Sequence, residues 1–329
     1  DVPLVRGALE SQGFSPEQIQ VLRDSEATRE GIVAAIRVHL LEKAQPGSVV
    51  FLHFSGHGQR LTDDDGDELD GYDEALVTFD APANPPPDYS GDLHLRDDEL
   101  GVLLQELRDV VGPSGNVVFS VDACFSGSVT RSAKGVAVRG VPAPIGPPAD
   151  RPSLARPEPG GGFLEGGRLQ PRGTLEVGET APYVVFSASR HDEPSWETLG
   201  PDGRPVGSLS YALSQAISDS RPGSTYRDLF DQVTKRMLIT APLQTPQMEG
   251  HQDTEVFSGK TVEQVPYFQV RSTSGESIAI VGGGQLAGIL PGTELAFHPP
   301  DTHEPTTAEP LGSGSVRRVD PLRAEVVLR

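Results

Sequence analysis

The sequence predicts an α/β fold with a mostly parallel central sheet flanked by helices, followed by a small C-terminal all-β domain. Two stretches, residues 48–54 and 117–121, are apolar and β-branched enough to form strands buried on both faces. Segments with helical spacing alternate with such strands, which is typical of a parallel sheet. Beyond residue 258 only short strand-like runs separated by Gly and Pro turns remain, and these indicate the β domain.

The predicted elements follow in chain order. Apolar residues at helical spacing predict a first helix over 2–13, and 19–22 predict a short strand after it. Thr28 is a suitable N-cap for a helix that reaches about residue 43, before a Pro-Gly turn. The later elements are predicted as a helix at 97–111, a strand at 183–189, and helices at 209–218 and 226–239.

Composition predicts two domains, 1–258 and 259–329. The first comprises a large portion over about 1–130, a flexible linker over about 131–182 and a small portion over 183–258. The linker is rich in Pro, Gly and Arg, and a connection of this length is usually functional or disordered. The C-terminal domain is predicted to be a small barrel or sandwich without a catalytic constellation. Its predicted strands are 267–271, 277–281, 294–298 and 315–328.

Net charge and cysteine content narrow the classes of partner. The chain has 329 residues, a formal charge of -20 and one cysteine, so it holds no internal disulfide. The negative charge argues against nucleic acid and anionic membranes as partners and fits attraction of cationic substrates. No apolar run approaches the roughly 18 residues of a membrane span.

The candidate chemistry lies where two predicted core strands end. One strand runs into Ser55-Gly56-His57-Gly58 and the other into Asp122-Ala123-Cys124-Phe125-Ser126-Gly127. Carboxyl ends of neighbouring parallel strands meet at one edge, so His57 and Cys124 are expected to form a dyad there. An imidazole activates a thiol nucleophile and protonates the leaving amine, while the Gly58 and Cys124 amides are candidate oxyanion donors. The alternative for a lone cysteine is a buried structural thiol.

The two motifs resemble the catalytic core of the metacaspases, including their bacterial relatives the orthocaspases, in the caspase-like cysteine peptidase family C14. Weaker similarity continues to about residue 258 through Gln244-Thr245-Pro246-Gln247-Met248-Glu249-Gly250. The resemblance implies a caspase-like fold and a cysteine endopeptidase that hydrolyses protein or peptide substrates after Arg or Lys. The rival hypothesis is a caspase-fold scaffold or calcium-responsive interaction module without proteolytic turnover.

The resemblance also implies a pocket for the basic residue that precedes the cut. Its members would be Asp122, Ser55 and Asp1, because paired acidic groups in a recess favour Arg or Lys. The Gln-Ala-Cys-Arg-Gly signature of true caspases is absent, and Asp122 replaces its glutamine. The alternative for Asp122 is a carboxylate that hydrogen-bonds its own turn.

Calcium is a further implication of the resemblance. In calcium-activated relatives the ligands correspond to Asp73, Asp97, Asp98 and a position that is Arg131 in this chain. Because arginine cannot ligate a cation, we expect no required cofactor. Two roles fit Asp97 and Asp98 equally well, metal binding and stabilisation of a helix N-terminus. For the acidic stretch 63–70 the sequence favours a solvated loop.

Self-cleavage in the linker is implied as well. The candidate sites are Lys134, Arg139, Arg168 and Arg172, each followed by a residue other than proline. A flexible linker without a cleavage site is the alternative.

The remaining expectations concern the protein as a whole. The resemblance implies a hydrophobic strand before the opening helix, but the sequence begins at Asp1 without one. We therefore expect that strand to precede Asp1 or another segment to replace it. A bacterial source, a cytoplasmic location and a monomer complete the expectations.

Overall fold

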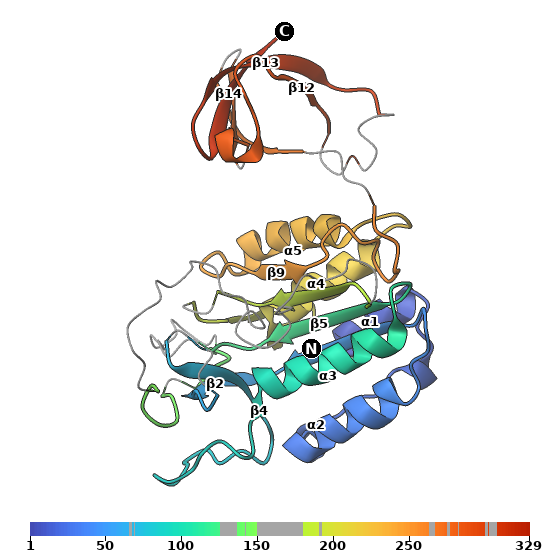
Figure 1. Cartoon of the computed structure of the whole chain (residues 1–329), viewed down its shortest axis with the longest axis vertical. Coiled ribbons are helices and arrows are strands. Elements are labelled where there is room, and N and C mark those ends of the chain that lie inside the picture. Colours follow the sequence, from blue (N-terminus) through green and yellow to red (C-terminus); the bar gives the residue numbers. More distant parts are fainter. Residues whose placement is uncertain are drawn as a thin grey trace. The chain divides into compact units, whose positions relative to one another are not determined.

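The computed structural model describes residues 1–65, 68, 70–125, 137–141, 143–149, 180–190, 193–262, 267–274, 277–281, 283–299, 302 and 308–329. They form two compact units, Asp1–Thr261 and Val262–Arg329, both drawn in Figure 1. Within the described residues, no helix combines the length and apolar character needed to cross a bilayer.

The first unit is built on a four-stranded sheet with the order β1-β5-β6-β9. The pairs β1–β5 and β5–β6 are parallel and β6–β9 is antiparallel, which confirms the mostly parallel sheet predicted from the sequence. All seven residues of β5 are buried, as its apolar composition predicts. The strands are β1 (Val49–Ser55), β5 (Asn116–Asp122), β6 (Tyr183–Ser187) and β9 (Gln247–Gly250).

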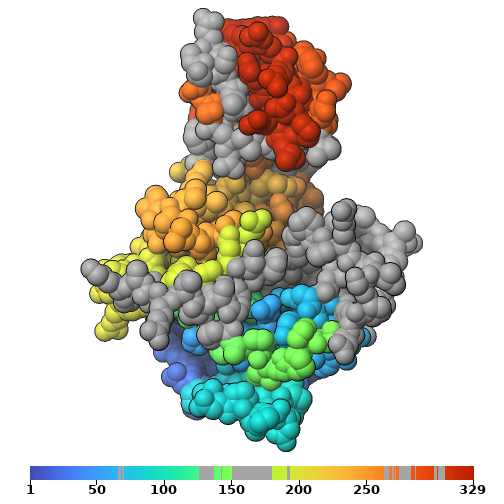
Figure 2. All heavy atoms as spheres, turned by 90° about the vertical axis from the view of Figure 1, so that its left-hand side faces the viewer, coloured from blue at the N-terminus to red at the C-terminus, as the bar shows by residue number. Residues whose placement is uncertain are grey.

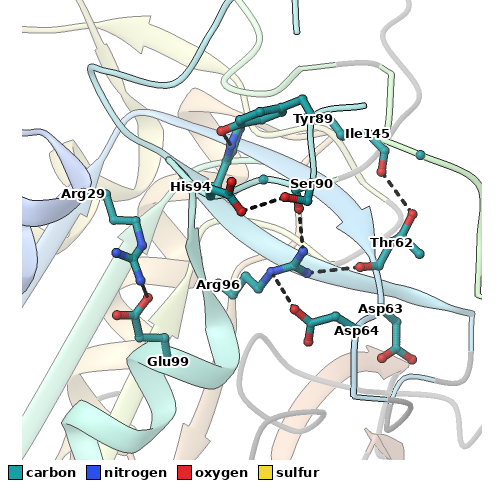
Figure 3. Close-up of a pocket in the computed structure, with 13 residues that line it drawn as sticks. Arg29, Thr62, Asp63, Asp64, Tyr89, Ser90, His94, Arg96, Glu99 and Ile145 are labelled. Carbon is teal, nitrogen blue, oxygen red and sulfur yellow. Dashed lines mark hydrogen bonds and ion pairs between the residues drawn. The ribbon is translucent and has the colours of Figure 1, made fainter. Parts of the chain in front are cut away.

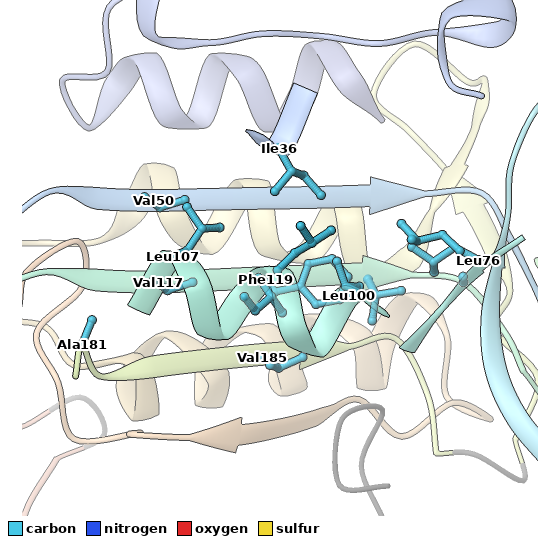
Figure 4. Packing of buried hydrophobic residues seen from close by; sticks show 14 of the residues in the cluster. Ile36, Val50, Leu76, Leu100, Leu107, Val117, Phe119, Ala181 and Val185 are labelled. Carbon is cyan, nitrogen blue, oxygen red and sulfur yellow. The ribbon is translucent and has the colours of Figure 1, made fainter. Parts of the chain in front are cut away.

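Helices cover both faces of this sheet. On one face α2, its π-helical continuation η3 and α3 bury a cluster that includes Ile36, Leu107 and Phe119 (Figure 4). On the other face α1, α4 and α5 bury a second cluster around Phe186 and Tyr226. The Thr28 hydroxyl caps α2 by accepting the Gly31 amide, as predicted. The helices are α1 (Val2–Ser11), α2 (Arg29–Ala35), η3 (Ile36–Leu41), α3 (Asp97–Val111), α4 (Ser208–Asp219) and α5 (Tyr226–Thr240).

The strand predicted over residues 19–22 is wrong. Those residues are irregular and lie between the short 3-10 turns η1 (Pro16–Gln18) and η2 (Asp24–Glu26). A strand needs a neighbour for its backbone hydrogen bonds, and no described strand pairs with this segment. Among the described residues no strand pairs with the edge of β1 opposite β5, so no described segment takes the place of the expected first strand.

Two small sheets surround the end of β1 and β5. The first has the order β2-β3-β4, with strands β2 (His57–Thr62), β3 (Tyr72–Val77) and β4 (Leu95–Arg96). The second is the hairpin of β7 (Glu197–Leu199) and β8 (Pro205–Gly207). His57 is therefore the first residue of a strand and not the centre of a turn, and Gly56 alone separates β1 from β2.

The second unit is one antiparallel sheet with the order β10-β11-β14-β13-β12. The described residues form a single five-stranded sheet, which confirms the small C-terminal all-β domain predicted from the sequence. Ile289, Val316, Ala324 and Val326 are its buried apolar core. Its strands are β10 (Gln269–Ser274), β11 (Ser277–Val281), β12 (Glu294–Phe297), β13 (Gly312–Val319) and β14 (Arg323–Leu328).

Candidate active site

The parallel register of β1 and β5 brings the two sequence motifs to one edge. Ser55 stands opposite Asp122, and the Gly56 amide donates to the Asp122 carbonyl at 3.2 Å. His57 and Cys124 each follow two residues beyond this pair. Cys124 is fully buried, whereas His57 is exposed at the start of β2. The sheet edge thus carries both predicted dyad residues, as the strand order requires.

Two backbone amides converge on one carbonyl oxygen in this edge. The Cys124 amide donates to the Arg139 carbonyl at 2.6 Å, and the Gly58 amide donates to it at 3.4 Å. These are the two donors predicted for an oxyanion hole. A Cβ on Gly58 would stand 2.5 Å from the Phe125 ring and 2.7 Å from the Cys124 carbonyl, so only glycine fits there.

The Arg139 side chain occupies an acidic pocket beside these amides. Its guanidinium donates to Ser55 Oγ at 2.5 Å, to Asp1 Oδ2 at 2.7 Å and to Glu197 Oε1 at 3.4 Å. Ser55 Oγ in turn donates to Asp1 Oδ2. Arg139 is only 7% exposed. The predicted pocket residues Ser55 and Asp1 therefore contact a basic side chain that belongs to the chain itself.

Asp122 forms the floor of the pocket and contacts serines. It accepts from the amide and hydroxyl of Ser210 at 2.7 and 2.6 Å, and from Ser195 Oγ at 3.3 Å. A Cβ on Gly207 would lie 2.0 Å from Asp122 Oδ2 and 2.8 Å from Arg139 Cζ. The Asp122 charge therefore lies close behind the guanidinium, and glycine at 207 keeps the space between them open.

The chain around Arg139 lies in the cleft as a short antiparallel strand. Val138 bridges Trp196, the Arg139 amide donates to the Ser195 carbonyl at 2.9 Å, and the Glu197 amide donates to the carbonyl of residue 137. The sequence analysis did not identify Glu197 or Gly207. No motif in the sequence marks either residue. Glu197 on β7 and Gly207 on β8 reach the pocket only because the folded chain brings this hairpin to the ends of β1 and β5.

Burial and charge set the protonation of the two histidines here. Partial loss of water lowers the pKa of His57, and the positive charge of Arg139 lowers it further. Burial lowers the pKa of His53 on β1 to about 4. Both imidazoles are therefore neutral at pH 7, and neutral His57 has a free nitrogen for a thiol proton. The Cys124 thiol donates to the Glu193 carbonyl at 3.6 Å.

The residues predicted to hold calcium are divided between two acidic groups. Asp73 and Asp98 lie with Asp64, while Asp97 lies with Glu68 and Glu74. In the first group the Arg96 guanidinium pairs with Asp73 and, at 3.4 Å, with Asp64. A calcium ion takes six to eight oxygens, so this group fits calcium poorly while Arg96 supplies the positive charge. The fourth predicted position, Arg131, lies outside the described residues.

In the second acidic group the positive charge of Arg60 acts on Glu74 and lowers its pKa, against the larger effect of burial. Burial raises the pKa of Glu74 to about 8 and also raises that of Asp97. Asp97 Oδ1 is buried without a hydrogen-bond partner. Three carboxylates fall short of a full calcium shell, so the ion would need further oxygens.

A pocket of about 600 Å³ lies beside β2, away from the dyad (Figure 3). Two arginines line this pocket. Arg96 donates to the Thr62 and Ser90 carbonyls, and Arg29 pairs with Glu99. Both of these arginines are therefore already engaged. Ile145 and Gly146 from the linker range close one side.

Comparison with known proteins shows the family of this chain. Residues 1–269 match the family model described as the caspase domain, Peptidase_C14. The chain belongs to the caspase domain family. The matched residues include the whole first unit. Within this family the chain is similar to metacaspases, as the names of its curated relatives show.

Those relatives are of moderate identity. The chain is 28% identical to Metacaspase-1A of Neurospora crassa over 281 residues, covering 75% of this chain and 57% of that protein. It is 28% identical to Metacaspase-1B of Aspergillus fumigatus, covering 69% and 58%. It is 30% identical to Metacaspase-3 of Arabidopsis thaliana, covering 70% and 57%. The chain thus spans somewhat more than half the length of these caspase-domain relatives.

A solved structure is also similar. A crystal structure of a Geobacter sulfurreducens protein matches with a TM-score of 0.48 and 22% identity, covering 76% of this chain and 81% of that one.

Proposed function

We propose that this chain is a cysteine endopeptidase that hydrolyses peptide bonds after Arg or Lys in protein or peptide substrates. The observation that carries the proposal is the position of Arg139. Its side chain fills the acidic pocket while its carbonyl oxygen accepts from the Gly58 and Cys124 amides. That is how a substrate residue before the cut would bind.

In the proposed reaction Cys124 Sγ attacks the carbonyl carbon of the basic residue. His57 takes the thiol proton and passes it to the leaving amine as the C–N bond breaks. The two amides stabilise the negative charge that develops on the carbonyl oxygen. Water then hydrolyses the thioester and restores the thiol. No step requires a cofactor.

Specificity is proposed to come from charge and fit together. Ser55 and the carboxylates of Asp1 and Glu197 contact the guanidinium, and Asp122 adds a buried negative charge behind it. An acidic residue before the cut would face these carboxylates without compensation, which is unfavourable.

The bond between Arg139 and Gly140 is proposed as the site of self-cleavage. A Cβ on residue 140 would lie 2.7 Å from the Cys124 carbonyl and 3.2 Å from its sulfur, so this pose requires the glycine that the chain provides. The other candidates, Lys134, Arg168 and Arg172, lie outside the described residues.

The alternative is a caspase-fold scaffold without turnover. Reporter peptides ending in Arg, Lys or Asp separate the two accounts, with Cys124→Ala as the matched control. The proposal expects reporter release after Arg and Lys that is lost in the variant. Failure of the wild-type chain to release any of the three would support the scaffold.

A further inference from the structure

The segment that follows Arg139 lies along β2 as an added parallel strand. Gly140 bridges Gly58, and Ile145 bridges Leu61. In Figure 2 this segment is the light-green patch against the blue of β2.

Hydrogen bonds hold the described residues of this segment. The Val141 amide donates to the Gly58 carbonyl at 2.9 Å, and the Ile145 amide donates to the Arg60 carbonyl at 2.9 Å. The Thr62 amide donates to the Ile145 carbonyl at 3.0 Å. Gln59 and Thr62 side chains donate to the Ala143 and Pro147 carbonyls, and the Ala149 amide donates to the Gly71 carbonyl. Main-chain pairing of this kind binds extended peptides at sheet edges.

One side chain anchors the strand. Ile145 is 9% exposed and packs with Leu61, Ala75 and Tyr89 in a small apolar cluster. Ala143, two residues earlier, is exposed. Within its described residues, the segment is therefore held by hydrogen bonds together with an apolar anchor, Ile145, six residues after Arg139.

All of these contacts lie on one side of the proposed cut. Hydrolysis between Arg139 and Gly140 breaks none of them, and the segment remains joined through residue 150 to the rest of the chain. Because it stays tethered, its local concentration at β2 stays high.

We propose that residues 140–141 and 143–149 remain bound along β2 after self-cleavage and occupy the surface that would receive substrate residues following the cut. This inference rests on the proposed peptidase function. The edge of β2 is then the binding surface for an extended peptide with an apolar residue six positions after its basic residue. A substrate with a long segment after the cut must displace the chain's own strand, whereas a substrate that ends at the cut does not compete with it.

The experiment compares two reporters on the self-cleaved enzyme. Both share the same residues up to Arg; the short one carries its fluorophore directly after Arg, and the long one continues with residues 140–149 of this sequence. Ile145→Asp removes the anchor, and Ala143→Asp places the same charge at an exposed position of the same segment. The ratio of kcat/KM for the long over the short reporter is measured for each.

We expect Ile145→Asp to raise this ratio by about tenfold. Burial of an aspartate in the apolar cluster is unfavourable, so the chain's own strand would bind β2 more weakly and compete less with the long reporter. Ala143→Asp should leave it unchanged, and the short reporter should be cleaved equally by all three enzymes. Equal ratios in all three would overturn the strand proposal alone. If the wild-type chain fails to cleave even the short reporter, the peptidase function itself is refuted.

Amide hydrogen exchange gives a second, direct readout. The amides of Val141, Ile145 and Ala149 should exchange as slowly in the self-cleaved enzyme as in uncleaved Cys124→Ala. Rapid exchange at these positions after cleavage would show that the strand leaves, which contradicts the proposal.

Discussion

Replacing Arg139 by glutamine tests how the pocket recognises a basic side chain. The guanidinium makes two short hydrogen bonds, to Ser55 at 2.5 Å and to Asp1 at 2.7 Å, and a longer one to Glu197 at 3.4 Å. Glutamine is shorter and uncharged, so it loses both short bonds and leaves the acidic groups without a cation. Self-cleavage at this bond should therefore slow greatly.

The expected size follows from the two short bonds. A hydrogen bond to a charged group contributes about 1.5–3 kcal/mol, so their loss costs about 3–6 kcal/mol. At about 1.4 kcal/mol per factor of ten in rate, self-cleavage should slow by about 10² to 10⁴-fold. The Glu197 contact is long and adds little.

The assay follows the fragment that begins at Gly140 by mass spectrometry over time. Arg37→Gln is the matched control, because it removes an exposed guanidinium on η3 that pairs with Glu106, far along the chain from the pocket. The control should cleave at the wild-type rate. If the Arg139→Gln variant releases the fragment that begins at Gly140 at the wild-type rate, the proposed role of the pocket in recognising a basic side chain is refuted.

Four other outcomes follow from the same geometry. Gly207→Ala places a methyl group between Asp122 and the guanidinium, and should lower kcat/KM for an Arg reporter by at least about tenfold with little change for Cys124 alkylation by a small reagent. Asp122→Asn keeps an oxygen for Ser210 but removes the charge, and should lower kcat/KM for Arg and Lys reporters by about 10 to 100-fold while the Tm changes little. His57 must be neutral to accept a proton and its pKa is lowered, so activity should fall with decreasing pH at a midpoint below the ordinary value of about 6.5; a kcat/KM profile with a midpoint above it contradicts this. Millimolar calcium should change kcat/KM by less than about twofold, because Arg96 already neutralises Asp64 and Asp73; a large activation would contradict that assignment.

The parts of the fold that local pattern determines were predictable. The helix expected at 97–111 is α3, and the strand ending before Cys124 is β5, because periodicity and burial leave a direct trace in the sequence. The placement of His57 and Cys124 beyond the same edge of the sheet followed from one rule about parallel strands. Strand β3 was not predicted, although it pairs with β2 across the acidic stretch that separates Thr62 from Tyr72.

The choice among linker sites could not be made from the sequence. Four basic residues were equivalent as motifs, and of these the structure describes only Arg139, whose carbonyl accepts from two amides. Which pocket residues contact the guanidinium also could not be predicted without the structure. Asp1 and Ser55 hydrogen-bond the guanidinium, whereas Asp122 accepts from Ser195 and Ser210.

Labelling with a thiol-reactive peptide tests the central claim most directly. A tripeptide chloromethyl ketone ending in Arg, and its counterpart ending in Asp, would be incubated with the self-cleaved enzyme and the adduct mapped by mass spectrometry. The account predicts one adduct, on Cys124, with the Arg reagent reacting far faster than the Asp reagent. Equal rates for the two reagents, or no adduct on Cys124, would contradict it.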